Sequence, residues 1–456
     1  MKKFKFLAIA AIFITIFSFP LSAFAQEDYK AEAGAAILID MVTGDVLFEQ
    51  AADEKMYPAS LTKVMTCLIA AEVGDLNAEV TASETAYLDL IDAGSTAGIL
   101  PGETMTLENL LYCAMLPSAN EACNIIAEYI SGSTADFVKL MNEKAAAMGC
   151  TGTNFVNCHG LHDENHYTTA RDMAIIGRAA FSNDIIRTVA GTAAYTVPAT
   201  NLSEPRDLES TDQLISDSIN ANYLYPYAIA GKTGYTTPAG RCLVSCAFKD
   251  DKELLSVVLK TDSIPQEDGS VRVMSFYETI RLFNYGFENW SYQTVIADGT
   301  PITEVPVKLG EGADSVVLCI SGEVTYLLPA SFDIEATRKV ITVFNQDNIT
   351  APITKGQELG LYEVYDENGV LLGSAPLTAL VDIERSVPEA VVDGIRETAR
   401  KPVIKAVVIV VVILVVIVIL GIMVRRQAAK RRAQQEKNRR RGQELRRRQE
   451  EYSGKK

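Results

Sequence analysis

Three short motifs contain the residues of this chain that are best suited to catalysis. Ser60 and Lys63 lie three residues apart. Ser118 and Asn120 flank a single alanine, and further along the chain Lys232 begins a Lys-Thr-Gly sequence. A serine hydroxyl is a weak nucleophile until a base takes its proton, and a neutral lysine amine is such a base. The three motifs therefore point to nucleophilic acyl transfer.

The segment that follows Ser60 has the periodicity of a helix, with apolar side chains at positions 61, 64, 65, 68 and 69. A helix that begins near Ser60 places Ser60 and Lys63 on one face. The positive end of the helix, burial and a second cation such as Lys232 would each lower the pKa of Lys63. The alternative is that Ser60 caps the helix and Lys63 is solvated. The other two motifs favour catalysis.

Ser118-Ala119-Asn120 follows Pro117 and precedes a helical run. A hydroxyl and an amide on one short loop are suited to relaying a proton and holding a substrate backbone. The competing interpretation is a plain helix cap, because serine and asparagine are favoured in that position. Taken alone, this motif does not separate the two.

The third motif lies on a predicted strand. The ammonium of Lys232 and the hydroxyl of Thr233 are suited to holding a carboxylate, and Gly234 allows another backbone to approach the strand. The backbone N–H of Tyr235 is then expected to pair with that of Ser60 as an oxyanion hole. An ordinary strand with an exposed lysine is the alternative.

The three histidines of the chain, His159, His162 and His166, lie in one loop beside Cys158. Their spacing matches no standard zinc pattern, so we predict no metal and no cofactor, and expect a polar loop bordering the active site. The eight cysteines include no C-x-x-C pair. Most of them are expected to be small buried side chains, and their disulfide state is left open.

The order of the predicted elements indicates an α/β (α+β) fold. It runs from a β-hairpin, residues 35–50, through helices at 80–185 to strands at 228–235, 240–249 and 253–260 and a helix near 271–284. An antiparallel sheet is therefore expected, in which the two ends of this sequence pair and helices pack around it. Short β-like runs then recur between residues 290 and 388 and predict a separate small all-β domain.

Both ends of the chain carry membrane-related patterns. Residues 1–25 have the lysines, apolar core and Ala-Phe-Ala site of a cleaved signal peptide. Residues 406–424 form an uncharged run of 19 residues, enough at about 1.5 Å per residue to cross a ~30 Å hydrocarbon core as a transmembrane helix. The tail, residues 425–456, has 14 lysines and arginines against four glutamates, which predicts that it is cytoplasmic and the body extracytoplasmic.

The charge of the body argues against nucleic-acid binding. The whole chain has a net charge of −16 although its tail is basic, so the segment between the signal peptide and the tail is strongly acidic. The basic tail is expected to fix the topology and to touch anionic lipid, with a cytoplasmic protein partner as the alternative.

At its motifs the chain resembles the low-molecular-mass penicillin-binding proteins, which are serine-type D-alanyl-D-alanine carboxypeptidases. The segments that carry the resemblance are Tyr57–Thr66, Leu116–Ala122, Asn157–Leu161, Gly231–Thr236 and Ala239-Gly240. It covers residues 29–285 well and implies a catalytic domain of the serine β-lactamase/DD-peptidase type over residues 29–287. It extends more loosely over 290–385, where residues 351–356 resemble the C-terminal β-domain of the family, here predicted as residues 290–388.

The resemblance implies a reaction and a role for each motif residue. Ser60 attacks the bond between two D-alanines at the end of a peptidoglycan stem peptide, with Lys63 as the general base. Ser118 and Asn120 assist proton transfer and positioning, and Lys232 and Thr233 bind the terminal carboxylate. β-Lactams are expected to acylate the same serine and inhibit the enzyme.

Two alternatives stay open. Family members commonly end in an amphipathic surface helix, whereas this chain is predicted to cross the membrane once, which raises the prospect of a membrane-anchored penicillin sensor. A β-lactamase shares the fold and the motifs but requires an efficient deacylating base, and no glutamate stands out for that role. The sequence favours the carboxypeptidase.

Overall fold

The computed structural model describes residues 29–90, 94–387, 391–392 and 401–453. The predicted signal peptide, residues 1–25, lies outside these ranges. The chain divides into two compact units. The first comprises Met1–Val295, Val324–Lys339 and Val364–Gly373, and the second comprises Ile296–Glu323, Val340–Glu363 and Ser374–Lys456. The domain limits 29–287 and 290–388 remain a prediction.

A five-stranded antiparallel sheet forms the centre of the first unit, in the order β2-β1-β9-β8-β7. Its strands are β1 (Ala35–Asp40), β2 (Val46–Gln50), β7 (Ala228–Thr236), β8 (Gly240–Lys249) and β9 (Lys252–Thr261). β1 pairs with β9, with Ala35 opposite Leu259 and Asp40 opposite Leu254. The predicted pairing between the two ends of this sequence is therefore confirmed.

Both faces of this sheet are covered. Along β1, Ile37 packs into the core shared with the helices that carry the first two motifs, whereas Leu38 packs into a second core beside α7 (Met274–Asn289). The same alternation runs along β9, where Val257 and Val258 face opposite sides. A strand buried on both faces has a continuous apolar sequence, which is the character of these strands.

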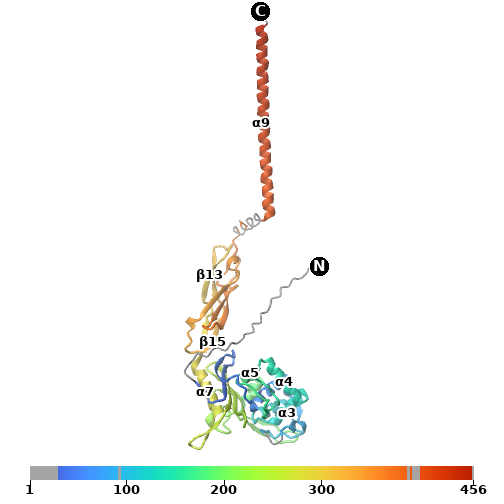
Figure 1. Ribbon diagram of the computed structural model, residues 1–456, viewed down its shortest axis with the longest axis vertical. Coiled ribbons are helices and arrows are strands. Elements are labelled where there is room, and N and C mark those ends of the chain that lie inside the picture. Colours follow the sequence, from blue (N-terminus) through green and yellow to red (C-terminus); the bar gives the residue numbers. More distant parts are fainter. Residues whose placement is uncertain (1–28, 91–93, 388–390, 393–400, 454–456) are drawn as a thin grey trace. The chain divides into compact units, whose positions relative to one another are not determined.

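Helices α3, α4 and α5 gather on the side of the first unit away from α7 (Figure 1). The helices of this group are α1 (Thr62–Val73), α2 (Leu107–Met115), α3 (Asn120–Ser131), α4 (Thr134–Ala147), α5 (Ala170–Phe181) and α6 (Asp184–Ala190). Three short strand pairs complete the unit: β3 (Glu79–Thr81) with β4 (Thr104–Thr106), β5 (Ala194–Val197) with β6 (Arg206–Glu209), and β10 (Ser263–Pro265) with β11 (Val271–Val273).

Two predicted helix starts require correction. The α-helix expected at Ser60 begins at Thr62, because Ala59–Leu61 forms a 3₁₀ turn in which Ala59 has a φ of 49°. The helix expected over residues 271–284 begins at Met274 instead. Apolar periodicity indicates that a helix exists but does not fix its first turn.

A second five-stranded sheet has the order β13-β14-β18-β17-β16. Its strands are β13 (Pro301–Pro306), β14 (Ser315–Ile320), β16 (Arg338–Val343), β17 (Glu358–Tyr365) and β18 (Leu371–Ala379). These five strands confirm the prediction that short β-strands recur in this part of the chain. Sequence analysis missed the two-stranded pair of β12 (Trp290–Ile296) and β15 (Val324–Pro329).

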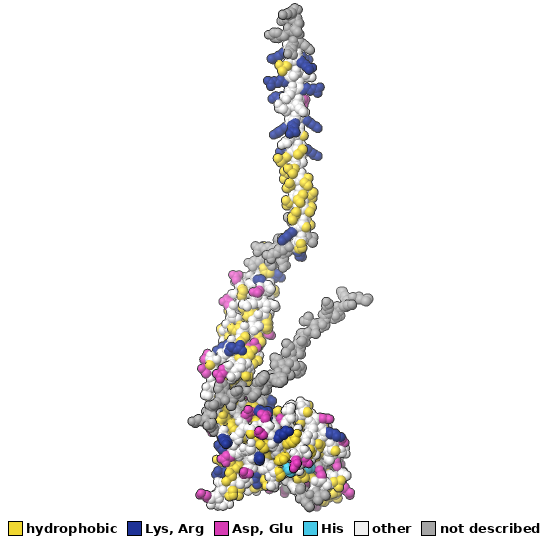
Figure 2. Space-filling view, viewed as in Figure 1, with side chains coloured by type: hydrophobic (Ala, Val, Ile, Leu, Met, Phe, Trp, Pro, Cys, Tyr) yellow, Lys and Arg dark blue, Asp and Glu magenta, His cyan; other side chains and the backbone are white. Residues whose placement is uncertain are grey.

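The last described element is one long helix, α9 (Pro402–Ser453). Within the part of the chain that the structure describes, Lys405–Arg448 is the one helical stretch long and apolar enough to cross a membrane, judged by length and composition. The predicted span, residues 406–424, lies inside it, and its apolar side chains are exposed, as at Ile413. Figure 2 shows this apolar band and the lysines and arginines that follow it along the helix.

All eight cysteines are free thiols, and all are buried. Burial raises the pKa of Cys123 to about 11 and that of Cys242 to about 12. Thiols with a raised pKa are poor nucleophiles at neutral pH. The expectation that most cysteines are buried apolar side chains is confirmed.

Candidate active site

The turn that carries Ser60 is held between two glycines from distant parts of the sequence. A Cβ atom on Gly234 of β7 would lie 3.1 Å from the backbone nitrogen of Ser60 and 2.9 Å from the carbonyl oxygen of Pro58. A Cβ atom on Gly160, which has a φ of +94°, would lie 1.9 Å from the carbonyl oxygen of Ala59. Backbone can approach this closely only where there is no side chain, so both glycines help to fix the position of Ser60.

Lys63 is fully buried and directed at Ser60. Its Nζ donates to Ser60 Oγ at 3.0 Å, to Asn120 Oδ1 at 2.7 Å and to the carbonyl oxygen of His159 at 2.6 Å. Burial lowers the pKa of this lysine, and nearby thiols and Glu121 oppose the shift. A neutral amine keeps two donors for Asn120 and His159 and offers its lone pair to the hydroxyl of Ser60.

These contacts exclude the alternative interpretation of the first motif. Lys63 is 0% exposed, so it is not a solvated lysine. Ser60 also caps no helix, because the residue before the 3₁₀ turn is Pro58 and the residue before α1 is Leu61, neither with a side-chain cap. Ser60 and Lys63 therefore have neither of the two structural roles of the alternative, and their contact is suited to catalysis.

The Ser118 loop has an unusual backbone. Ser118 has a φ of 66°, a region that serine seldom adopts, and its Oγ is buried with no hydrogen-bond partner among the described residues. The N-cap of α3 is Ala119, which makes no side-chain capping bond, so neither Ser118 nor Asn120 serves as a helix cap. A strained, unpaired hydroxyl is common at functional sites.

The Lys-Thr-Gly motif lies on β7, the edge strand of the sheet. Lys232 is 1% exposed, which rules out the exposed-lysine alternative. Burial lowers the pKa of Lys232 to about 7, and Lys63 adds to the shift when it is protonated. Thr233 Oγ1 lies 2.6 Å from the hydroxyl of Thr211, and Tyr235 is 58% exposed.

One pocket of about 420 Å³ joins the three motifs. From the predicted set its lining contains Ser60, Ser118, Thr233, Gly234 and Tyr235. The remaining three residues, Lys63, Asn120 and Lys232, are buried rather than part of the lining. The nucleophile is thus accessible from the pocket while the cations are shielded from water.

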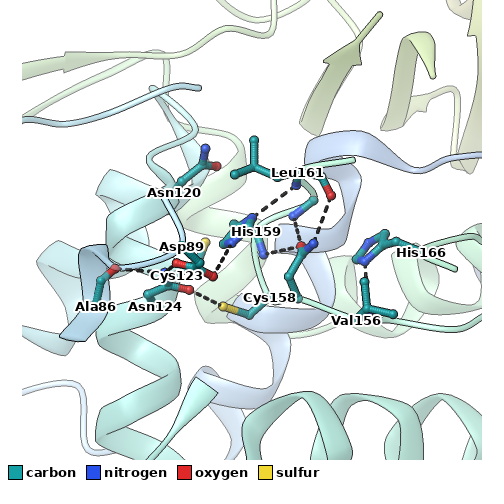
Figure 3. Close-up of polar contacts among 12 residues, drawn as sticks. Ala86, Asp89, Asn120, Cys123, Asn124, Val156, Cys158, His159, Leu161 and His166 are labelled. Atoms are coloured by element: carbon teal, nitrogen blue, oxygen red, sulfur yellow. Dashed lines mark hydrogen bonds and ion pairs between the residues drawn. The ribbon is translucent and has the colours of Figure 1, made fainter. Parts of the chain in front are cut away.

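Two of the three histidines, His159 and His166, are buried, whereas His162 is exposed, and Figure 3 shows the contacts of the two buried rings. His159 is 2% exposed, and its Nε2 lies 3.2 Å from Asp89 Oδ2 while its Nδ1 accepts from the backbone N–H of Leu161. Burial lowers the pKa of His159. A neutral ring that accepts at Nδ1 carries its proton on Nε2 and donates it to Asp89.

His166 has a comparable structural role. Its Nδ1 accepts from the backbone N–H of Val156, and its Nε2 lies 2.7 Å from Thr62 Oγ1, whose hydroxyl donates to the carbonyl oxygen of Ala59. Burial lowers the pKa of His166 to about 3. The loop borders the active site as expected, because the carbonyl oxygen of His159 accepts from Lys63, although His159 and His166 themselves are buried. No group of three or more histidine, cysteine, aspartate or glutamate side chains suited to a metal ion occurs within the described ranges.

Sequence analysis missed several residues of the site. The contacts of Asp89, Thr62 and Thr211 join segments far apart in the chain, and no local pattern marks these positions. Asn157–Leu161 was noted only for its resemblance, although the carbonyl oxygen of His159 in this segment accepts from Lys63.

Comparisons with known proteins agree with this geometry. A family model described as D-alanyl-D-alanine carboxypeptidase matches residues 22–263, and one described as Penicillin-binding protein 5, C-terminal domain, matches residues 290–385. The chain belongs to the D-alanyl-D-alanine carboxypeptidase family, and the fold is that of the penicillin-binding proteins.

Individual relatives match along most of their length. The chain is 32% identical over 393 residues to D-alanyl-D-alanine carboxypeptidase DacF of Bacillus subtilis (strain 168), covering 84% of this chain and 95% of the relative. It is 30% identical to DacC of Escherichia coli (strain K12), covering 81% and 90%. The solved structure of penicillin binding protein 5 from Haemophilus influenzae has a TM-score of 0.58 at 26% identity, covering 79% of this chain and 100% of that one.

Proposed function

We propose that this chain removes the terminal D-alanine from peptidoglycan stem pentapeptides through an acyl-enzyme on Ser60. The observation that carries the proposal is the bond of 3.0 Å between Lys63 Nζ and Ser60 Oγ, formed by a lysine whose pKa is lowered by burial. Membership of the family supplies the bond that is cut, because the relatives are named D-alanyl-D-alanine carboxypeptidases.

In the acylation step, Lys63 accepts the proton of the Ser60 hydroxyl while Ser60 Oγ attacks the carbonyl carbon of the penultimate D-alanine. The other two hydrogen bonds of Lys63, to Asn120 Oδ1 and to the carbonyl oxygen of His159, hold the amine toward the hydroxyl. General-base assistance of this kind contributes roughly 10²- to 10⁴-fold to a rate.

The oxyanion of the tetrahedral intermediate is assigned to the backbone N–H groups of Ser60 and Tyr235. The close packing at Gly234 supports this pairing, because it brings β7 against the nitrogen of Ser60. Thr233 and Lys232 act on the terminal carboxylate from the same strand.

Collapse of the intermediate breaks the C–N bond and requires a proton on the leaving amine. Ser118 Oγ donates it and takes up in exchange the proton that Lys63 removed from Ser60, which returns the amine of Lys63 to its neutral form. The unpaired, buried position of Ser118 on the pocket wall supports this role. Water then attacks the ester carbonyl and gives a proton to the neutral amine of Lys63. The bond to Ser60 Oγ breaks, Lys63 returns that proton to Ser60, and the shortened stem peptide leaves. A β-lactam places its strained amide at the same serine and acylates it.

The first test is D-alanine release from a stem pentapeptide by the full-length protein in detergent. Release that is lost in Ser60→Ala supports a carboxypeptidase with this nucleophile. Labelling of Ser60 by a fluorescent penicillin without D-alanine release would instead favour a sensor. Rapid, repeated nitrocefin hydrolysis would indicate a β-lactamase.

The same proposal includes the place of the protein in the cell. Helix α9 supplies the single membrane span over residues 406–424, with the catalytic domain, residues 29–287, outside and the basic tail, residues 425–456, in the cytoplasm. Added protease should digest the tail only in inverted membrane vesicles. Digestion of the tail in intact, wall-free cells would contradict this topology.

A further inference from the structure

The active-site pocket contains a cation that has no part in the chemistry described so far. Arg241 is on β8, directly opposite Tyr235 of β7. It lines the same pocket as Ser60 and Thr233. Among the described residues that line this pocket, Arg241 alone carries a charge.

The guanidinium group of Arg241 is held in place before any ligand binds. Its Nε donates to Ser263 Oγ at 2.6 Å, and its central carbon lies 5.1 Å from the centre of the Tyr235 ring. A guanidinium fixed at Nε and stacked on an aromatic ring has little freedom left to lose on binding. Its two terminal nitrogens form the fork that matches a carboxylate.

No carboxylate of the described residues fills that fork. Other arginines of the first unit form ion pairs, for example Arg206 with the buried Glu103 and Arg187 with Glu253. Arg241 forms no ion pair within the described residues, although the chain has a net charge of −16. An unneutralised, oriented cation in a pocket of an acidic protein points to an anionic ligand.

Lys232 is less suited to act as the permanent positive charge for that ligand. It is 1% exposed, lies outside the pocket lining, and donates to the carbonyl oxygen of Thr233. Its pKa of about 7 also means that it loses its proton near neutral pH. An arginine retains its charge throughout this range.

We propose that Arg241 binds the C-terminal carboxylate of the substrate, beside the hydroxyl of Thr233, and thereby selects peptides with a free terminus. This inference rests on the proposed function and extends it. The terminal carboxylate lies one residue beyond the scissile carbonyl, and consecutive Cα atoms are about 3.8 Å apart. Residues directly opposite on antiparallel strands have Cα atoms about 4.5–5.5 Å apart. Arg241 therefore starts one strand away from Tyr235, the assigned oxyanion donor, within reach of the leaving D-alanine.

The test compares Arg241→Gln and Arg241→Lys with the full-length wild type. The substrate is diacetyl-L-lysyl-D-alanyl-D-alanine, whose terminal carboxylate is its only charge, and its C-terminal amide serves as the neutral analogue. We expect Arg241→Gln to lower kcat/KM for the acid by roughly 10- to 100-fold, mostly through KM, and to leave the amide nearly unchanged. Arg241→Lys should fall between the two, because it keeps the charge but loses the fork.

Arg272→Gln is the matched control. It removes the same charge from a position outside the pocket lining, where the guanidinium lies over the ring of Tyr277. It should leave both substrates unaffected. The proposal is overturned if Arg241→Gln keeps the wild-type kcat/KM for the acid, or if it loses activity equally on acid and amide. A loss seen only with substrates that carry a side-chain carboxylate on the diamino acid would also overturn it.

A second measurement separates this inference from the proposed function. The rate of Ser60 acylation is compared for a penicillin with a free carboxylate and for its methyl ester. In Arg241→Gln the preference of the wild type for the free acid should shrink by about 10-fold or more. If the wild type releases no D-alanine, the proposed function fails, yet an unchanged preference in Arg241→Gln would still refute the role of Arg241. Unchanged Tm values show that the variants are folded.

Discussion

The basic side chains of the two units lie in opposite surroundings, as a comparison of Lys63 and Lys232 in the first unit with the arginines of α9 in the second shows. The two lysines are buried within the fold, and burial is the main reason that their pKa values are lowered. The arginines of α9 are exposed, and the ion pair between Arg440 and Glu436 leaves both side chains more than two-thirds exposed. Exclusion of water turns a lysine into a base, whereas a solvated cation serves only through its charge.

The largest effect should follow from removing the buried base. Lys63→Met keeps the length of the side chain but has no proton acceptor, so we expect acylation of Ser60 by penicillin to slow by roughly 10³-fold or more. Stopped-flow acylation and D-alanine release measure this loss. Lys139→Met, at an exposed lysine of α4, is the matched control and should behave as wild type. A Lys63→Met protein within 10-fold of wild type would show that another group is the base.

Lys232→Met should lower activity and raise stability. The pKa of Lys232 falls from 10.5 in its unperturbed state to about 7 in the fold, so the unfolded chain binds more protons between these two values. Burying the protonated lysine therefore lowers the free energy of unfolding. This penalty is fully present below about pH 7 and disappears as the pH rises toward 10.5.

Thermal unfolding at several pH values tests this sign. We expect the Tm of Lys232→Met to exceed that of wild type by roughly 4–8 °C at pH 6 and the gap to close near pH 10. D-alanine release should fall by about 100-fold. A Tm difference between Lys232→Met and wild type that widens as the pH rises would contradict a lowered pKa for the buried lysine.

A smaller loss of activity is expected from a change at Asp89, which reaches Lys63 only through His159. Asp89 accepts from His159, whose carbonyl oxygen in turn accepts from Lys63. Asp89→Ala should reduce kcat/KM about 3- to 10-fold because the carbonyl that orients the amine is held less firmly. Asp89→Asn keeps an acceptor for the histidine and should recover most of the loss. Equal defects in the two variants would argue against this positioning role.

The smallest effect belongs to the exposed cations. Glutamine in place of Arg439, Arg440 and Arg441 together should change D-alanine release by less than about 2-fold, because solvated charges that line no part of the pocket contribute little to the chemistry. The Tm should also stay within about 1 °C. A large loss of activity would mean that the tail acts on the catalytic unit, and the contrast between the two regions would then fail.

The sequence predicts the sheet well because its strands have strong local patterns. The largely apolar strands β8 and β9 are bounded by turn residues, and the pairing of β1 with β9 follows from the order of the elements. The start of the helix near Ser60 was predicted less accurately. The positive φ of Ala59 accompanies a close contact with Gly160, and apolar periodicity gives no information about such a contact.

The site was predictable only where residues form motifs. Ser60, Lys63 and Lys232 are marked by spacing, but Arg241 and Asp89 acquire their places through strand register and a loop contact. Long-range contacts of this kind depend on the completed fold. The burial of His159 and His166 shows the same limit, because a cluster of polar residues in sequence looks solvated until its partners are known.

The eight thiols of the first and second units have a practical consequence. No cross-link restrains the chain, and each thiol is covered by the fold, so alkylation requires the structure to open. The number of cysteines modified by a membrane-impermeant reagent thus reports how much of the protein has opened, and the time course reports how often. Cys67, which is 0% exposed beside the site, would be modified only in molecules whose catalytic core has come apart.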